Sequence, residues 1–198
     1  ITPSFAANIA DVGENYWANK EINIVVDNDI MTLNGKQFNP EGVMTRIEFV
    51  NALLKVLSNE NLNVNISNKF SDVTKATPGY ENILRSQQLG LVYGYPNGTF
   101  QPERNVLRSE AQSVISHITK DMNADKTILN QFKDAKAVPA WATNVYAKTI
   151  NYGIYVNHPD SRELRPNDSL SRAEAAVLLA RLKNKLDLVK QEYIGTTT

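Results

Sequence analysis

The stretch Gly90–Glu110, GLVYGYPNGTFQPERNVLRSE, sets the pattern that organises the whole chain. A helix is expected to end at Gly90, because glycine is favoured just past a helix terminus. Tyr95–Gly98 then forms a tight turn, and Pro102 interrupts regular structure. The next helix begins with Arg108, and a glutamate follows two residues later. The stretch therefore predicts a helix end, a turn-rich loop and a helix start.

The same order of signals occurs three times along the chain. Successive prolines of the pattern are 62 and 64 residues apart. A period of this size indicates a repeat architecture in which neighbouring units share one core. Each copy has a proline followed six residues later by an arginine at a helix start: Pro40 and Arg46, Pro102 and Arg108, Pro166 and Arg172.

Each repeat is expected to consist of a helix, a loop and a second helix, so the predicted fold class is mainly α. The expected bounds are residues 8–60, 68–121 and 130–186, with a C-terminal tail at 187–198. A unit of about 50 residues is marginal alone, because a small domain buries too little surface on folding. We therefore expect three units packed together rather than three independent domains.

Bulk composition excludes several classes of protein. The 198 residues include 21 basic and 21 acidic side chains, so the formal net charge is zero. A nucleic-acid or membrane-surface protein normally has a basic excess on one face. The chain has no cysteine, which excludes disulfides and cysteine zinc sites. No apolar run approaches the ~20 residues that span a bilayer.

Residues 1–7, ITPSFAA, could be the end of a secretory signal, since small residues cluster where such signals are cut. They could equally be an ordinary chain start. Two polar stretches, residues 58–69 and 121–130, predict linkers between the repeats. The last helix is expected to continue through Leu186 and Val189 and to fray at residues 195–198.

In the first helix of the first repeat, Ile22, Val25 and Val26 follow Trp17 at roughly helical spacing and should form one apolar face. It should end near Asp29, where the other repeats have glycine. Aspartate tolerates left-handed backbone geometry better than most residues, so Asp29 is expected to replace the glycine.

The second helix of each repeat carries a start signal of its own. Thr45–Glu48 and Ser171–Glu174 both fit a capping box, in which the hydroxyl and the glutamate satisfy each other's backbone amides. In the second repeat Leu107 occupies the cap position, so only the glutamate half, Glu110, remains. This helix start is expected to be the weakest, since a lost cap costs about 1 kcal/mol.

Arg46, Arg108 and Arg172 each stand in the first turn of a helix. Free amides and the helix dipole favour an anion there, and a guanidinium adds a planar fork suited to a carboxylate or phosphate. Two interpretations remain open. The arginines could bind an anionic ligand, or each could pair with an acidic residue of a neighbouring unit. The candidate partners are Asp11, Asp72 and Asp134.

Trp17, Tyr80 and Trp141 follow these aspartates at similar distances. An aromatic residue on an apolar helix face usually belongs to the core, and the alternative is a platform on which a sugar stacks. His117 and His158 occupy unrelated positions, and no nucleophile elbow, P-loop or dinucleotide fingerprint is present. We expect no catalytic residue, metal or cofactor.

Three units of this form resemble tandem S-layer homology domains over about residues 9–186. The resemblance is carried by Gly94–Phe100 (GYPNGTF), Thr45–Glu48 (TRIE) and Ser171–Glu174 (SRAE). It implies a pseudo-threefold assembly whose grooves hold a cell-wall glycan, usually a secondary cell-wall polysaccharide with pyruvylated amino sugars. A ketal-linked pyruvate presents a carboxylate, which suits an arginine at a helix start.

The resulting expectation is a non-catalytic anchoring module, secreted to the bacterial cell wall or S-layer. Its expected partners are wall polysaccharide or peptidoglycan and, as a further candidate, other S-layer subunits, with no nucleic acid and no membrane insertion. The alternatives are a protein-assembly module of the lattice, the anchor of a larger envelope enzyme, and a binder of modified peptidoglycan in a double-membraned bacterium. The candidate glycan-binding residues are Arg46, Arg108, Arg172, Asp11, Asp72, Asp134, Trp17, Trp141, Tyr95, Asn97 and Gly98. The helix-capping residues that support them are Thr45, Glu48, Glu110, Ser171 and Glu174.

Overall fold

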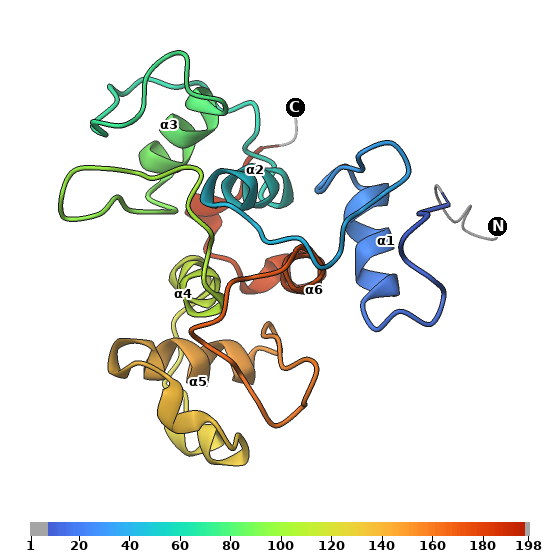
Figure 1. Ribbon diagram of the computed structural model, residues 1–198. Helices are drawn as coiled ribbons and strands as arrows, with labels where there is room; N and C mark the ends of the chain where they lie inside the picture. The colour runs from blue at the N-terminus through green and yellow to red at the C-terminus, as the bar shows by residue number, and fades with distance from the viewer. Residues whose placement is uncertain (1–7, 197–198) are drawn as a thin grey trace.

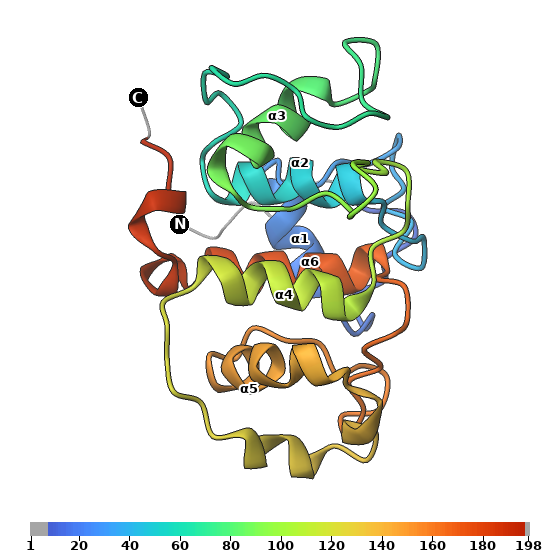
Figure 2. The same cartoon turned by 90° about the vertical axis from the view of Figure 1, so that its left-hand side faces the viewer.

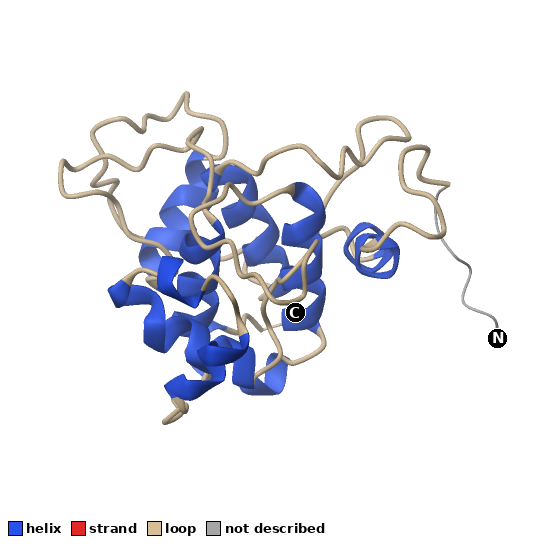
Figure 3. Ribbon diagram, turned by 60° about the horizontal axis from the view of Figure 1, so that its bottom comes forward, coloured by secondary structure: helices blue, strands red, loops and turns tan. Residues whose placement is uncertain are grey.

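The computed structural model describes residues 8–196, and the regular structure in this range is entirely helical (Figure 3). The six α-helices are α1 (Asn19–Asp27), α2 (Arg46–Val56), α3 (Tyr80–Leu89), α4 (Arg108–Ile118), α5 (Thr143–Asn151) and α6 (Arg172–Lys183). Short 3-10 segments occur at Lys126–Gln131, Ala135–Ala137, Ala140–Ala142, Leu186–Leu188 and Gln191–Tyr193. The expected mainly α fold of helix–loop–helix repeats is confirmed.

The second helices of the three repeats, α2, α4 and α6, lie at the centre of the molecule (Figure 1). The first helices, α1, α3 and α5, lie outside them in three directions. α3 packs on α2, α5 packs on α4, and α1 packs on α6. The first helix of each repeat therefore packs on the second helix of the preceding repeat, and the first repeat closes on the last (Figure 2).

A ring of three backbone hydrogen bonds joins the repeats just before their second helices. The amide of Met44 donates to the carbonyl of Leu170 (2.9 Å), Leu170 donates to Val106 (2.7 Å), and Val106 donates to Met44 (3.0 Å). All three side chains are buried. Each repeat thus donates to one neighbour and accepts from the other, which is the order that a pseudo-threefold arrangement requires.

The apolar positions that repeat in the sequence form the core. Ile22 and Val25 of α1 are fully buried, as the helical spacing predicts. Phe38, Phe100 and Leu164 occupy equivalent loop positions, and each is at most 1% exposed. Full burial of one such side chain contributes about 1.5–3 kcal/mol. These loop residues therefore fix the loops to the helices with a free energy that a turn alone does not supply.

Local predictions at the ends of the first repeat's helix are confirmed. α1 ends at Asp27, and Asp29 follows in the left-handed region with φ 54°. Gly90 and Gly153, with φ 68° and 70°, have the same geometry after α3 and α5. Asp29 therefore replaces glycine at a backbone position where most side chains are strained.

One of the two predictions about the connecting segments is wrong in part. The second linker, residues 121–130, overlaps a 3-10 segment at Lys126–Gln131. Asp125 accepts a hydrogen bond from the amide of Thr127, and Leu129 is buried. The cap and the apolar anchor order a stretch that its polar composition assigned to a linker. Residues 58–69, by contrast, contain no helix.

The last helix does not continue as predicted, because α6 ends at Lys183. The chain then turns back, and Val189 and Tyr193 are buried against the ends of other helices. Asn59 donates to the carbonyl of Tyr193 (2.8 Å), and the amide of Gly195 donates to Leu57 (2.8 Å). The C-terminal segment up to Gly195 therefore packs on the first repeat instead of fraying.

The possible signal remnant at residues 1–7 lies outside the described residues, as do residues 197–198. Within residues 8–196 we find no helix with the length and apolar character needed to cross a membrane.

Candidate functional site

The start of α2 carries the predicted capping box. The amide of Thr45 donates to the carboxylate of Glu48 (2.8 Å), and the amide of Glu48 donates to the Thr45 hydroxyl (3.3 Å). At the start of α4 the side chain of Leu107 has no acceptor. Only the bond from the Leu107 amide to the carboxylate of Glu110 remains (3.2 Å). Both helix starts are as the sequence predicts.

The start of α6 departs from the expected box. The Ser171 hydroxyl accepts from the amide of Glu174 (3.1 Å), so the serine half is present. The Glu174 carboxylate instead pairs with Arg108, with 3.4 Å between Oε2 and Nη1. Burial explains the difference, because a nearly buried carboxylate gains more from a cation than from one exposed amide.

Most of the free amides that the anion-site interpretation assumed at the helix starts are already bonded within the protein. The amides of the first two residues of each second helix donate to carbonyls of the next repeat's loop. The third amide in α2 and α6 is taken by the Thr45 or Ser171 hydroxyl. At the starts of α2 and α6 an anion would therefore meet the arginine side chain without additional amides. The six bonds run from Arg46 and Ile47 to Arg104 and Pro102, from Arg108 and Ser109 to Asp168 and Pro166, and from Arg172 and Ala173 to Gly42 and Pro40.

The arginine side chains also bind loop carbonyls of the next repeat, in the same cyclic order. Arg46 donates from Nε to the carbonyl of Phe100 (2.8 Å) and from Nη2 to Tyr93 (3.0 Å). Arg172 donates from Nε to Phe38 (2.7 Å) and from Nη2 to Thr32 (2.9 Å). Each guanidinium therefore keeps part of its fork free of these bonds.

Both of these arginines lie over an aromatic ring of the loop that they bind. The guanidinium carbon of Arg46 is 4.7 Å from the Phe100 ring centroid, and that of Arg172 is 4.7 Å from the Phe38 ring. Both side chains are half-buried, and burial lowers the pKa of each below its ordinary value. An arginine stays protonated in a protein even so. Each groove therefore presents a fixed, partly desolvated positive charge.

Arg108 is different, and the expectation that the three arginines are equivalent is wrong. Its side chain is 2% exposed and donates to the carbonyls of Val156 (2.8 Å) and His158 (3.2 Å). The ion pair with Glu174 completes its surroundings. The third repeat's loop lacks the GYPNGTF turn, and it places His158 where the other loops leave the guanidinium accessible. Arg108 therefore does not face an open groove in this structure.

The aspartates that were proposed as glycan ligands are bound to the loops of their own repeats. Asp11 accepts hydrogen bonds from the amides of Phe38 (2.8 Å) and Asn39 (2.7 Å). Although burial alone would raise the pKa of Asp11, these amides and the charge of Arg172 lower it. The amides of Phe100 and Gln101 are bound in the same way by Asp72, and those of Leu164 and Arg165 by Asp134.

The residue that follows the aromatic or leucine in each loop has a left-handed backbone. Asn39, Gln101 and Arg165 have φ angles of 56°, 56° and 48°. The aspartate that binds each of these amides stabilises the strained turn. The three carboxylates thus bind the loop amides, and within residues 8–196 none of them forms an ion pair with Arg46, Arg108 or Arg172.

The turn residues Asn97 and Gly98 likewise build the loop. Asn97 accepts from the Thr99 amide (3.2 Å) and hydroxyl (2.7 Å), and Gly98 has φ 80°. Tyr95 has a different position, because the guanidinium carbon of Arg46 is 4.8 Å from its ring centroid. Tyr95 therefore lies beside the arginine, while Asn97 and Gly98 shape the turn that carries it.

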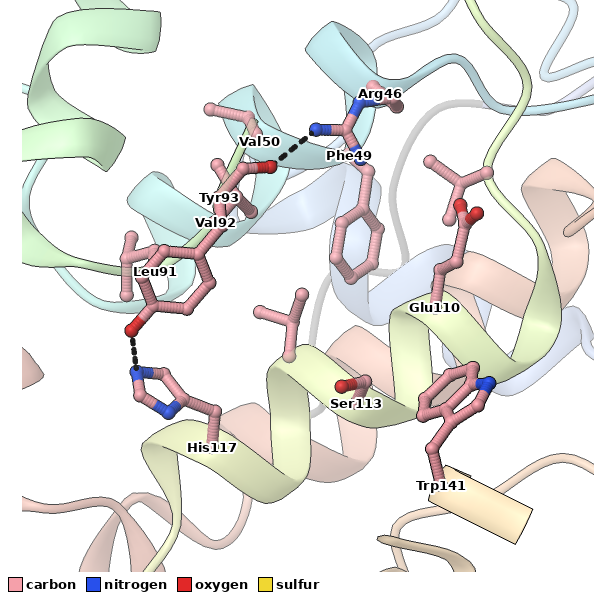
Figure 4. A pocket seen from close by; sticks show the side chains of 12 residues that line it. Arg46, Phe49, Val50, Leu91, Val92, Tyr93, Glu110, Ser113, His117 and Trp141 are labelled. Atoms are coloured by element: carbon pink, nitrogen blue, oxygen red, sulfur yellow. Dashed lines mark hydrogen bonds between the residues drawn. The ribbon is translucent and has the colours of Figure 1, made fainter. Parts of the chain in front are cut away.

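The groove beside Arg46 has a volume of about 260 Å³. Figure 4 shows Trp141 and Glu110 at one end of it and Tyr93 and His117 at the other. Tyr93 and Trp141 are 63% and 57% exposed, so their rings are available to a ligand. Of the two tryptophans that are candidate glycan-binding residues, Trp141 therefore lines a groove and does not belong to the core. A flat apolar ring beside a cation is the combination that suits an acidic sugar.

The groove beside Arg172 consists of two adjoining hollows of about 390 and 500 Å³ that share Arg172, Glu48 and Thr32. Lys55 and Asn82 line the first of them. This groove is more polar than that beside Arg46, and no tryptophan lines it.

The corresponding space beside Arg108 is filled by the protein itself. Trp17 stacks on His158 with 3.8 Å between ring centroids, and burial lowers the pKa of that imidazole. Gln112 donates to the carbonyl of Ile154 (3.0 Å), and Arg181 donates to Tyr155. Trp17 therefore acts as an internal packing residue, the alternative that the sequence left open for it.

Sequence reasoning missed three groove residues that share one position. Lys55, His117 and Arg181 each occur nine residues after the groove arginine of their own helix. Lys55 and His117 line the two open grooves, while Arg181 binds the loop in the filled one. The signal was a basic residue in the last turn of each second helix, which also suits the helix dipole.

A sequence model of the S-layer homology domain matches residues 8–50, 69–111 and 131–176. The chain is 28% identical over 180 residues to the exoglucanase XynX of Acetivibrio thermocellus, which is 88% of this chain and 16% of that protein. It is 30% identical over 152 residues to a cellulosome-anchoring protein of the same species, covering 74% of this chain and 33% of that protein. It is 28% identical over 185 residues to an S-layer protein of Bacillus licheniformis, covering 91% and 20%. The chain thus spans a third or less of each of these relatives.

Proposed function

This chain belongs to the S-layer homology family, and on that premise we propose that it binds an acidic, pyruvylated wall polysaccharide in the grooves beside Arg46 and Arg172. The family and its relatives place it at the bacterial cell surface as an anchoring module. The chemistry of the ligand and the choice of grooves are our proposal.

The observation that supports it is the state of the two guanidiniums. Backbone carbonyls and an aromatic ring hold Arg46 and Arg172 in one orientation at the edge of an open groove. A pre-organised guanidinium loses little side-chain entropy when it binds a carboxylate. The ketal-linked pyruvate of a wall sugar supplies such a carboxylate, and the exposed ring of Trp141 can cover an apolar sugar face.

One groove alone is too weak to hold a protein on a cell wall. A charge-assisted hydrogen bond contributes about 1.5–3 kcal/mol. Two grooves on one chain, acting on a polymer with many acidic substituents, raise the effective affinity by multivalency. Because Arg108 is buried, we assign two binding grooves to the chain instead of three.

The test uses purified wall polysaccharide with and without its ketal-linked pyruvate, which mild acid removes. Binding to the intact polymer should weaken about tenfold in Arg46→Lys and in Arg172→Lys, since lysine keeps the charge but loses the planar fork. Arg162→Gln is the matched control, because Arg162 is an exposed loop arginine paired with Asp160. Equal binding of the wild type to the pyruvylated and depyruvylated polymers would overturn the proposed ligand.

A second candidate follows from the relatives. One of them is an exoglucanase of which this chain matches 16%, so the chain could anchor a larger envelope enzyme. This concerns what is anchored rather than how the anchor binds. The sequence of the full-length gene distinguishes it from an S-layer subunit. A protein-lattice role would instead leave surface attachment unchanged when pyruvate is removed from the wall, and a peptidoglycan binder would bind sacculi that lack the polysaccharide.

A further inference from the structure

We propose that the groove beside Arg46 continues along α4 into a second anion-binding subsite formed by Lys126, Lys148 and Lys190. This proposal rests on the proposed function and deepens it. The ligand of the subsite would be an acidic group further along the same polysaccharide chain.

The first observation is a polar hollow of about 520 Å³ beyond the far end of the Arg46 groove. His117 lines both spaces, so the two adjoin at this residue. Lys126, Lys148 and Lys190 line the hollow together with one carboxylate, that of Asp121. The four side chains therefore have a net charge of +2, in a chain whose formal net charge is zero.

The second observation is that α4 lines both spaces, and that the wall facing it is formed by the short 3-10 segment Ala140–Ala142 and by α5, which follows it directly. On α4, Glu110 and Ser113 line the groove, and His117 follows on the same face at helical spacing. Glu110 and His117 are seven residues apart, which is about 10 Å along a helix. Figure 4 shows them at opposite ends of the groove. The groove therefore leads along α4 toward the lysines.

The opposite wall has the same register. Trp141 lines the groove from the 3-10 segment just before α5, and Asn144 and Lys148, which are four residues apart on one face of α5, line the hollow. Lys148 donates to the carbonyls of Ser116 (2.6 Å) and Thr119 (2.8 Å) at the end of α4. α4 and α5 thus run in the same direction and wall one continuous track.

The third observation concerns how the cations are held. The ammonium groups of Lys148 and Lys190 converge on one carboxylate oxygen of Asp121, at 3.7 and 3.2 Å. The Asp121 side chain is 87% exposed, so solvent screens these pairs and they are weak. A ligand carboxylate or phosphate could take the place of Asp121 between the two ammonium groups. Lys126 is exposed beside them and has no ion pair within residues 8–196.

Exposed apolar side chains mark the same track. Four large apolar residues stand out as exposed within residues 8–196, and three of them line these two spaces. Tyr93 and Trp141 line the groove, and Met122, which is 40% exposed, lines the hollow. A sequence of apolar contacts and cations is suited to a polymer of acidic sugars, which alternates apolar ring faces with charged groups.

The experiment compares two probes. One is a single monosaccharide that carries ketal-linked pyruvate, which is too short to reach from the Arg46 groove into the lysine hollow. The other is the long wall polysaccharide, which reaches both spaces. Lys126→Glu, which reverses one exposed charge, and Lys190→Gln, which removes one half-buried charge, should each weaken binding of the long chain by about fivefold and leave the monosaccharide affinity unchanged. Asp121→Asn should strengthen binding of the long chain, because it removes the competing carboxylate.

Lys36→Glu is the control for the charge change, since Lys36 is exposed and lines neither space. Thermal unfolding checks that each variant is folded. Unchanged long-chain affinity in Lys126→Glu and Lys190→Gln, with the wild type binding both probes, would overturn the second subsite and leave the proposed function intact. Failure of the wild type to bind either probe would overturn both. An equal loss in Lys36→Glu would reduce the effect to overall charge and would also contradict the subsite.

Discussion

Trp17 of the first repeat and His158 of the third stack face to face, with ring centroids 3.8 Å apart and planes inclined by only 4°. The two residues are 141 positions apart in the sequence, and their contact fills the space beside Arg108. The stack therefore links the first repeat to the last at the place where the other repeats leave an open groove.

The His158 imidazole should make the stability of the protein depend on pH. Burial lowers its pKa below 6.5, Glu174 and Glu41 partly oppose this, and Arg108 and Arg165 add to it. As the pH falls below 6.5 the unfolded chain therefore takes up the proton first, and the folded state loses stability until His158 titrates there as well. Urea midpoints should fall between about pH 7.5 and pH 5.5. His158→Phe keeps a ring against Trp17 and should show a smaller fall. Equal slopes in the two proteins would contradict this assignment.

Breaking the Arg108–Glu174 pair should be costly. Side chains of Arg108 and Glu174 are only 2% and 11% exposed, so Arg108→Met leaves a carboxylate without its cation in a nearly buried place. The expected loss is about 3 kcal/mol in the free energy of unfolding, measured by urea denaturation. Arg108→Met combined with Glu174→Gln should recover most of that loss. A double variant as unstable as the single one would show that lost packing, and not the unpaired charge, causes the loss of stability.

The three helix starts should differ in their response to substitution. Thr45→Val removes the hydroxyl of the complete box and should lower the free energy of unfolding by about 1 kcal/mol. Leu107→Thr supplies the missing hydroxyl at the start of α4, where Glu110 is already in place, and should raise it by up to about 1 kcal/mol. Both are measured by chemical denaturation. A neutral Thr45→Val would mean that the neighbouring repeat's carbonyls hold this helix start without the cap.

Asp72 should stabilise the second loop only while it is ionised. Burial opposes ionisation, but the amides of Phe100 and Gln101 lower the pKa of Asp72 below 3.8. Its contribution is therefore present above pH 3.8 and is lost as the pH falls through the lower, folded-state pKa. Asp72→Asn should have a lower melting temperature at neutral pH, and the gap to the wild type should narrow near pH 3. The exposed Asp187 offers the control Asp187→Asn, which should leave the melting temperature unchanged.

Features determined by a few neighbouring residues could be predicted from the sequence. The threefold period, the start of α2 at its Thr45 box and the left-handed Asp29 all depend on local chemistry, and the structure has each of them. A capping box involves residues three positions apart, and glycine preferences depend on one backbone angle. Such signals are legible without knowing the tertiary fold.

Features that depend on contacts between different repeats could not be predicted in this way. The arginines bind backbone carbonyls, and every residue has a carbonyl, so the sequence does not indicate which one is bound. The pattern of charged residues indicated aspartates as partners instead. Arg108 looks like Arg46 in its own helix. Its burial is decided 50 residues away, where the third loop lacks the turn and brings His158 inward. The return of Val189 and Tyr193 is also a long-range contact, whereas the local pattern predicted that the last helix continues through Val189.

The unit of sequence and the unit of stability do not coincide in this chain. Each outer helix packs on the inner helix of the repeat before it in the sequence. The outer helix of the first repeat, α1, packs on α6 of the last repeat, so it has a partner only when α6 is present. A shortened gene with two copies would leave one outer helix and one inner helix without companions, so its product should not behave as two-thirds of the protein. A chain with fewer copies would therefore need a second chain to cover the helix faces left without a partner.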